Sequence, residues 1–356
     1  MTNWSLEKLM KAGLGLAALV LAYFLAYHFA TLIGYAVVAV ILTYILDPIV
    51  NRMQAAGMNR TLAISATLSA LILILIWIST NIIPKVANQM VQLAGQMNIE
   101  NLQNIARQIE DRLTERFTFL PDGFLQQNLT QAFEELIDVG QLPTALSNII
   151  GIFTNIFSAA LVIPFATFFF LKDGSKIRRN LLQLVPNKYF ETTLSLLDKI
   201  ETRLGIYFRS VLLQSILVAF FSWLFLTIVG LNNALAVGIA IGIANTIPYF
   251  GPVIGYILSM MVSIVEVGNF SLILPCIIAI FLVQLLDNLI FQPFIFSRSA
   301  DMHPIAILFI ILIGAELAGI LGMLIAIPLA TVIKITINQV RWSLNNYYVF
   351  RSTKST

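Results

Sequence analysis

The chain has 356 residues, of which 58% are hydrophobic and only 11% are charged, and its formal net charge is +3. Soluble domains carry about 25% charged residues, so this composition excludes an ordinary soluble domain and predicts an all-α polytopic membrane protein. The small net charge argues against a nucleic-acid surface, so nucleic acid is not an expected partner. The single cysteine, Cys276, excludes an intrachain disulfide.

Uncharged runs alternate with charged segments along the chain. Apolar runs of about 20 residues are long enough to span a membrane as helices, and basic segments favour the cytoplasmic side. The sequence therefore predicts six parts: N-terminal transmembrane helices (1–83), a helical extracytoplasmic domain (84–148), a transmembrane helix (149–171), a cytoplasmic amphipathic segment (172–205), a C-terminal transmembrane core with broken hairpins (206–334) and a cytoplasmic tail (335–356).

Local signals predict three helix ends in the first half of the chain. The uncharged run 12–46 is too long for one typical span of about 20 residues, which predicts a tight hairpin between His28 and Gly34. Asp47-Pro48 is expected to end this pair of helices. Lys172-Asp173-Gly174 is expected to stop the helix that covers 149–171, with the glycine just past its last turn.

The two charged segments differ in sign. Residues 84–148 hold four basic and eight acidic side chains, whereas residues 172–209 hold eight basic and four acidic ones. This difference predicts that the first segment lies outside the cell and the second inside. We interpret the outer segment as a packed helical cap or an oligomer contact in preference to a ligand-binding domain.

The C-terminal core contains two predicted breaks. Gly230-Leu231-Asn232-Asn233 indicates a turn, and residues 242–255 combine prolines and glycines inside apolar sequence. Residues 234–265 and 304–333 either cross the membrane or re-enter it as hairpins. Both alternatives put the basic tail inside the cell, and the re-entrant one also places Arg298 there.

Two acidic residues of this core, Asp287 and Glu316, stand inside apolar runs. A charged side chain at the centre of a bilayer costs roughly 2.5 to 3.5 kcal/mol on insertion scales, so such residues usually serve a function. Gln284, Asn288 and Gln292 follow at i, i+4 and i+8 on one helical face beside Asp287. This stripe predicts hydrogen bonding to a polar solute, although the same amides are also expected where two membrane helices adhere.

Helix-breaking residues accompany these acids, as they do in transporters whose helices are broken at the binding site. Asn245, beside one break, is the sixth predicted pathway residue, with a helix cap as its alternative role. The predicted hinge residues are Pro248, Gly251, Pro252, Pro293, Gly314, Gly319 and Pro328.

Four motifs resemble those of the autoinducer-2 exporter (AI-2E) family of bacterial permease-like membrane proteins. They are PFATFFFLKDG (164–174), ANTIPYFGPVIG (244–255), DNLIFQPFIFSRSADMHP (287–304) and GAELAGILGMLIAIPLATVIK (314–334), and they occur in the order typical of the family. Many members carry an acid directly before the proline of the third motif, where this chain has Gln292. An ion-binding carboxylate is therefore not carried over to that position.

The resemblance implies a multi-pass protein of the bacterial inner membrane, with about eight hydrophobic segments, some of them re-entrant, and a cytoplasmic C-terminus. It also implies homo-oligomers, with a pentamer as the expected number. Members are linked to export of the signal autoinducer-2, and some are described as sodium/proton antiporters. We therefore expect export of a small polar organic solute, with a sodium/proton antiporter as the alternative.

Other classes of function are less compatible with the sequence. No Gly-rich Lys-Ser/Thr nucleotide loop occurs, so an ion gradient is the expected driving force. Two histidines and one cysteine leave little for an enzyme, and we expect no cofactor and no metal site. A structural or interaction protein that uses the outer segment as its contact surface stays open, and it would tolerate neutralisation of Asp287 and Glu316.

Overall fold

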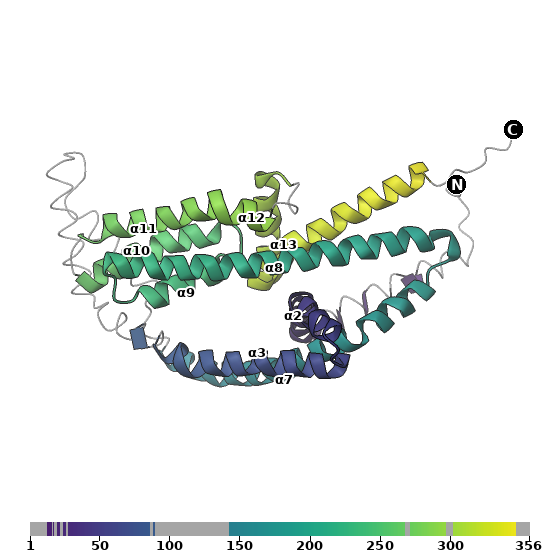
Figure 1. Ribbon diagram of the computed structural model, residues 1–356, viewed down its shortest axis with the longest axis horizontal. Coiled ribbons are helices and arrows are strands. Elements are labelled where there is room, and N and C mark those ends of the chain that lie inside the picture. The colour runs from purple at the N-terminus through teal and green to yellow at the C-terminus, as the bar shows by residue number, and fades with distance from the viewer. Residues whose placement is uncertain are drawn as a thin grey trace. The chain divides into compact units, whose positions relative to one another are not determined.

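The computed structural model describes residues 28–85, 88–89, 142–267, 271–296 and 302–346, with scattered residues between 13 and 25. All regular structure among these residues is helical, which confirms the all-α prediction (Figure 1). Six of the described helices are long and apolar enough to cross a membrane: Ala30–Ala55, Arg60–Lys85, Asn187–Val229, Phe250–Val267, Ile273–Ile295 and Pro304–Ser343. The chain is therefore a polytopic membrane protein, and the count of about eight segments stays a prediction.

The chain divides into two compact units, one of residues 1–68 and 150–180 and one of residues 69–149 and 181–356. The first unit contains α2 (Ala30–Ala55), the start of α3 (Arg60–Asn81) and the middle of α7 (Leu142–Gln183). Its helices are joined by Arg60, whose guanidinium donates two hydrogen bonds to the Leu171 carbonyl oxygen, at 2.7 and 3.1 Å. Most of the predicted extracytoplasmic domain lies outside the described residues.

The three helix ends predicted in this half of the chain are wrong. Residues 30–34 already belong to α2, and the amide of Phe29 still bonds the Leu25 carbonyl at 2.9 Å, so no hairpin forms between His28 and Gly34. Pro48 lies inside α2, since a proline removes one backbone hydrogen bond without having to end the helix. Gly174 lies inside α7, where a helical glycine costs only about 1 kcal/mol relative to alanine.

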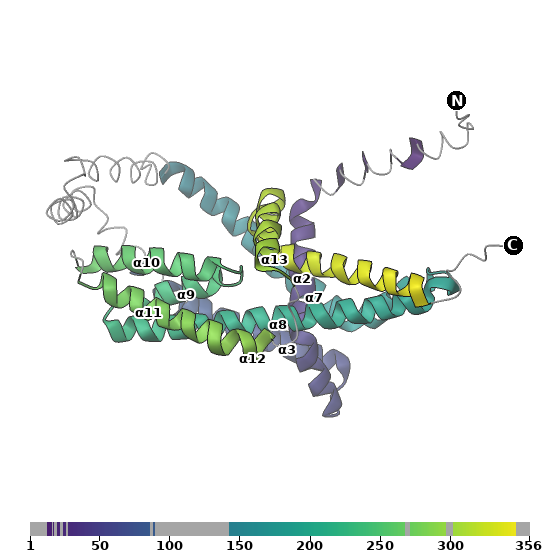
Figure 2. The ribbon, with the colours of Figure 1, turned by 90° about the horizontal axis from the view of Figure 1, so that it is seen from above.

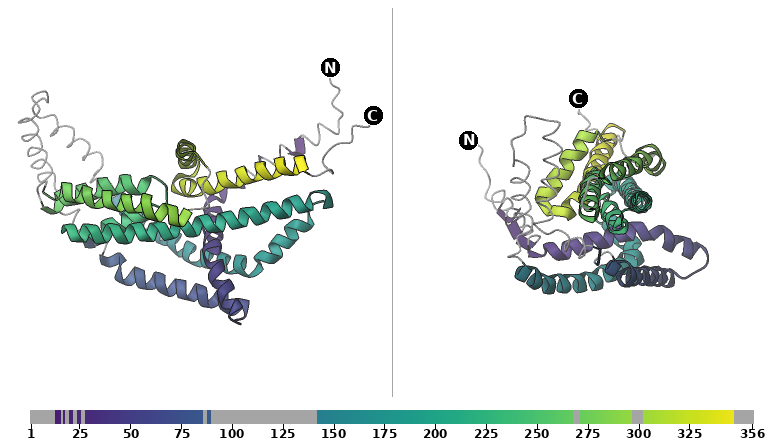
Figure 3. Two further views of the ribbon diagram at one scale, coloured as in Figure 1. Left: turned by 45° about the horizontal axis from the view of Figure 1, so that its top comes forward. Right: turned by 90° about the vertical axis from the view of Figure 1, so that its left-hand side faces the viewer.

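The second unit is built around α8 (Phe190–Val229), which follows a short 3-10 turn at Asn187–Tyr189. Helices α9 (Ala234–Ala244), α10 (Phe250–Val267) and α11 (Ile273–Leu286) pack with it around a shared apolar core (Figures 1 and 3). Glycines permit the closest approach: a Cβ added at Gly238 would lie 2.7 Å from the Trp223 backbone nitrogen. Small residues allow such close packing between membrane helices.

Helices α9 and α10 form a hairpin at the predicted break. Residue Gly230 ends α8 in the left-handed conformation (φ 95°), as the turn signal predicted, and the chain reverses again between Ala244 and Phe250. The Glu266 carboxylate accepts hydrogen bonds from the amides of Asn232 and Asn233, at 2.9 and 2.8 Å. The start of α9 and the end of α10 therefore lie side by side, so the backbone between them folds back on itself.

Helix α13 (Pro304–Asn346) is a second hairpin. Its backbone leaves helical geometry at Ala318 and Gly319, and Gly319 has φ 57° and ψ −138°, which a residue with a Cβ rarely adopts. Gly314 in the first arm lies directly against Gly322 in the second, and Figure 2 shows the change of direction. The second arm continues along α8, where the Thr192 and Ser343 hydroxyl groups are 2.9 Å apart.

Candidate functional site

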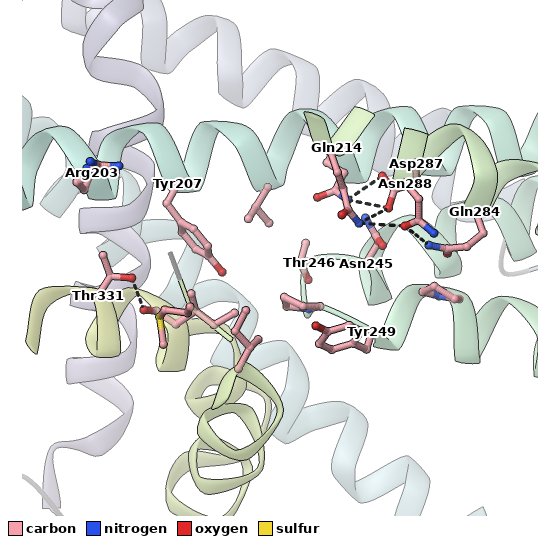
Figure 4. A pocket seen from close by; sticks show the side chains of 17 residues that line it. Arg203, Tyr207, Gln214, Asn245, Thr246, Tyr249, Gln284, Asp287, Asn288 and Thr331 are labelled. Atoms are coloured by element: carbon pink, nitrogen blue, oxygen red, sulfur yellow. Dashed lines mark hydrogen bonds between the residues drawn. The ribbon is translucent and has the colours of Figure 1, made fainter. Parts of the chain in front are cut away.

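A cavity of about 410 Å³ lies within the second unit (Figure 4). Helix α8, the turn between α9 and α10, the end of α11 and both arms of α13 form its wall. A volume in this range suits a small organic molecule. The lining residues are Arg203, Tyr207, Val211, Gln214, Asn245, Thr246, Pro248, Tyr249, Pro252, Gln284, Asp287, Asn288, Gln292, Met302, Ile307, Ile327 and Thr331.

Asp287 lies at the polar end of this cavity with 3% of its surface exposed. It begins a π-helical turn (Asp287–Phe291) between α11 and α12 (Gln292–Phe296). Such turns are frequent at functional sites, because they insert an extra residue into the helix. The Gln214 side-chain amide of α8 donates to both carboxylate oxygens, at 2.7 and 2.9 Å.

The three amides predicted to share a helical face are joined to this carboxylate. Gln292 donates to Asp287 at 3.1 Å and to the Asn288 side-chain oxygen at 3.3 Å, and Gln284 donates to the same oxygen at 2.9 Å. An amide oxygen this close to a carboxylate would be repelled, so the NH2 groups of Gln214 and Gln292 must face Asp287. The negative charge of Asp287 is thus stabilised by neutral donors.

Asn245 is the second buried polar side chain of the cavity. It is 9% exposed, and its side-chain nitrogen has no hydrogen-bond partner among the described residues. A Cβ added at Gly251 would lie 2.5 Å from the Asn245 side-chain oxygen, so only glycine leaves room for it. Nearby Tyr249 has φ 70°, a strained conformation for a residue with a side chain. Such strain is typical of functional sites.

The opposite end of the cavity is formed by Arg203 and Tyr207, one turn apart on α8 (Figure 4). An apolar cluster adjoins this end: Ile247 of the α9–α10 turn packs with Ile311 and Ile327, which belong to the two arms of α13. The two helical hairpins therefore meet directly beside the cavity.

The structure places five of the six predicted pathway residues in one cavity: Gln284, Asp287, Asn288, Gln292 and Asn245. The sixth, Glu316, is exposed near the tip of the α13 hairpin and does not line it. Of the predicted hinge residues, Pro248 and Pro252 line the cavity, while Gly251, Gly314 and Gly319 shape the two hairpins. Pro293 and Pro328 lie within α12 and α13.

Sequence reasoning missed Gln214, Tyr207 and Arg203. Gln214 is the only glutamine between Arg209 and Gln284, so the signal used for Gln284, an amide in an apolar run, would have found it. Arg203 was interpreted only as a charge that sets orientation. Among the described residues, no three His, Cys, Asp or Glu side chains come together as a metal site.

Known proteins match nearly the whole chain. A family model described as AI-2E family transporter matches residues 16–342. "Putative transport protein YrrI" of Bacillus subtilis is 27% identical over 84% of both chains, and "Putative transport protein YueF" of the same organism is 28% identical over 86% of this chain and 83% of its own. "Putative permease PerM" of Escherichia coli is 26% identical over 91% of both.

Proposed function

Since the chain belongs to the AI-2E transporter family, we propose that it exports a small polar organic solute through the cavity around Asp287. The observation that carries this proposal is the cavity itself, a hydrogen-bonding space of about 410 Å³ among helices apolar enough to cross a membrane. Autoinducer-2 is the first candidate solute, because a chain of amides beside a carboxylate suits a polyhydroxylated molecule.

In the proposed mechanism the two helical hairpins move relative to α8 and α11 and open the cavity to each side in turn. The contact of Ile247 with Ile311 and Ile327 supports this, because apolar contacts between two hairpins can separate without breaking hydrogen bonds. Broken helices at a binding site are typical of secondary transporters. An ion gradient drives the movement.

We place the protein in the bacterial inner membrane with its C-terminus in the cytoplasm, where the basic ends of α7 and α13 would lie. Gln89, just after α3, donates to the Asn232 carbonyl oxygen at 3.1 Å. This bond supports placing Gln89 and the turn at Asn232 on the same, outer side of the membrane. The protein assembles as homo-oligomers, with a pentamer as the expected number, and acts as a transporter without enzyme activity.

The sodium/proton antiporter is the second candidate function, favoured by a buried carboxylate between apolar helices. The hydrogen-bond donors around Asp287 argue against a sodium site at this carboxylate. A hard cation needs converging oxygen ligands, whereas two NH2 groups, whose hydrogens would repel a cation, point at this carboxylate.

Flux measurements in proteoliposomes test the proposal, with autoinducer-2 and sodium in parallel. Wild type is compared with Asp287→Asn, and with Asp198→Asn, which removes an exposed carboxylate of α8 outside the cavity. We expect the solute flux to fall at least about tenfold in Asp287→Asn, which corresponds to an interaction loss of about 1.4 kcal/mol. The flux should be unchanged in Asp198→Asn. Sodium-dependent proton flux without solute would support the antiporter, and absence of both fluxes would contradict both.

A further inference from the structure

The geometry points to an anionic, hydroxylated organic solute, whose acidic group is bound at Arg203 and whose hydroxyl groups are bound near Asp287 and Asn245. This inference rests on the proposed transport through the cavity and names its substrate class. The two ends of the cavity carry opposite charge: among the residues that the structure describes, Arg203 is the one basic lining residue and Asp287 the one acidic lining residue.

The two charged groups do not neutralise one another. Arg203 and Gln214 are eleven residues apart on α8, about 16 Å along a helix that rises 1.5 Å per residue, and Asp287 contacts Gln214 (Figure 4). Asp287 is stabilised instead by the amides of Gln214 and Gln292. A ligand that spans the cavity therefore meets a guanidinium at one end and an amide-stabilised carboxylate at the other.

The polar end offers a hydrogen-bond donor to a ligand. The buried side-chain NH2 of Asn245 has no partner among the described residues, although it lies in the wall of the cavity. A buried donor without a partner costs about 1 to 3 kcal/mol, and a ligand oxygen would remove that cost. Asp287, in turn, can accept a hydrogen bond from a ligand hydroxyl through its remaining lone pairs.

A second, smaller cavity of about 340 Å³ extends the basic end. It lies between α8 and the second arm of α13 and is lined by Lys199, Arg203, Ile335, Asn338, Gln339 and Trp342. Arg203 lines both cavities, and the Lys199 ammonium donates to the buried Gln339 side chain at 2.6 Å. Within the described part of the chain, two basic groups and no acidic one line this smaller cavity, which raises the local concentration of anions. The smaller cavity is thus the entry for the acidic group.

Guanidinium binds carboxylate and phosphate through paired, charge-assisted hydrogen bonds. The acidic group is therefore a carboxylate or a phosphate, and a lipid headgroup offers the same chemistry as a soluble phosphate. The polar end of the cavity favours the soluble molecule, because a headgroup bound at Arg203 would leave Asn245 and Asp287 unused.

The test is binding by calorimetry and counterflow in proteoliposomes of neutral phosphatidylcholine, with ribose 5-phosphate, ribonate, ribose and inorganic phosphate as probes. We expect at least one of the two anionic sugars to bind about tenfold or more tightly than ribose and than inorganic phosphate. Arg203→Gln should remove this preference while ribose binding stays the same, and Arg203→Lys should restore part of it. Arg341→Gln removes an exposed charge of α13 outside both cavities and should change nothing.

Failure of this inference is distinguishable from failure of the proposed function. If ribose and the anionic sugars bind and move equally well, and Arg203→Gln has no effect, the solute is not an anion, while transport through the cavity stands. If phosphatidylglycerol displaces the anionic sugars at equal concentration, the site belongs to a lipid. If no solute moves in wild type and Asp287→Asn behaves identically, the transport itself is contradicted.

Discussion

Gln214 and Asp287 are 73 residues apart in the chain, yet one amide group of Gln214 donates to both carboxylate oxygens of Asp287, at 2.7 and 2.9 Å. This pair joins α8 to the π-helical turn after α11. It fixes a buried carboxylate in the wall of the cavity, and no described basic side chain bonds to that carboxylate. That part of the cavity is thus available to neutral hydroxyl groups.

We predict that Gln214→Leu destabilises the protein, because it leaves the buried carboxylate with Gln292 as its remaining side-chain donor. Loss of one partner of a buried hydrogen bond costs about 1 to 3 kcal/mol, whereas replacing both partners by apolar groups can be nearly neutral. Thermal unfolding in detergent should therefore show a lower Tm for Gln214→Leu and recovery in the double variant with Asp287→Leu. Gln183→Leu, at the exposed end of α7, is the matched control. Equal Tm for all variants would show that the pair contributes nothing.

Much of the second unit follows from local sequence signals. Glycine and proline interrupt hydrogen-bonded helices, so the turn at Gly230 and the break between Ala244 and Phe250 could be predicted from residue type alone. The amide stripe beside Asp287 follows in the same way from helical spacing. The false helix ends at Pro48 and Gly174 show the limit of these signals, because packing and continued helical hydrogen bonds outweigh a local cost of this size.

The partners across the cavity could not be predicted from local signals. Whether Gln214 faces Asp287 depends on how α8 packs against α11, which is decided by many apolar contacts far apart in the chain. In the sequence, Arg203 indicates only which side of the membrane its segment faces, and Glu266 only where an apolar run ends. Their contacts, with the cavity and with the amides of Asn232 and Asn233, arise from the tertiary fold.

We predict that Gly251→Ala impairs solute binding, because the added Cβ would lie 2.5 Å from the Asn245 side-chain oxygen and must displace it. Gly174→Ala is the control, since a Cβ added at this helical glycine would meet nothing within 4 Å. Overpacking of this kind costs about 1 to 3 kcal/mol. If this cost destabilises only the solute-bound state, it corresponds to roughly a five- to hundredfold loss of affinity. Calorimetry measures the solute affinity of wild type and of both variants. Equal affinities would exclude a binding role for Asn245.

We predict that Gly322→Ala prevents the two arms of α13 from packing. A Cβ at this position would overlap the backbone of Gly314, which cannot move aside as a side chain can. Introducing cysteines at one exposed position of each arm, Phe309 and Leu329, in wild type and variant, with spin labels attached, measures how far the arms separate. Gly174→Ala, where a Cβ meets nothing within 4 Å, should leave these distances unchanged. Unchanged distances in Gly322→Ala as well would contradict the close contact of the arms.

The last prediction concerns Glu266, which joins the two ends of the α9–α10 hairpin. Its carboxylate accepts hydrogen bonds from both backbone amides and from the Asn233 side chain. Glu266→Gln keeps the size of the side chain, but its NH2 group would face one of these donors. Hydrogen bonds to charged groups contribute about 1.5 to 3 kcal/mol, so we expect local opening at this end to become roughly ten- to hundredfold more frequent.

Amide hydrogen exchange at Asn232 and Asn233 measures that opening directly. Exchange at these two residues should accelerate in Glu266→Gln, while the middle of α8 keeps its wild-type rates, because the core around Val218 and Leu226 is not touched. Glu191→Gln changes an exposed acid in the first turn of α8 and should leave both rates unaltered. Acceleration spread over all of α8 to α11 would mean that Glu266 supports the whole bundle, and unchanged exchange would mean that the hairpin is closed by its apolar packing alone.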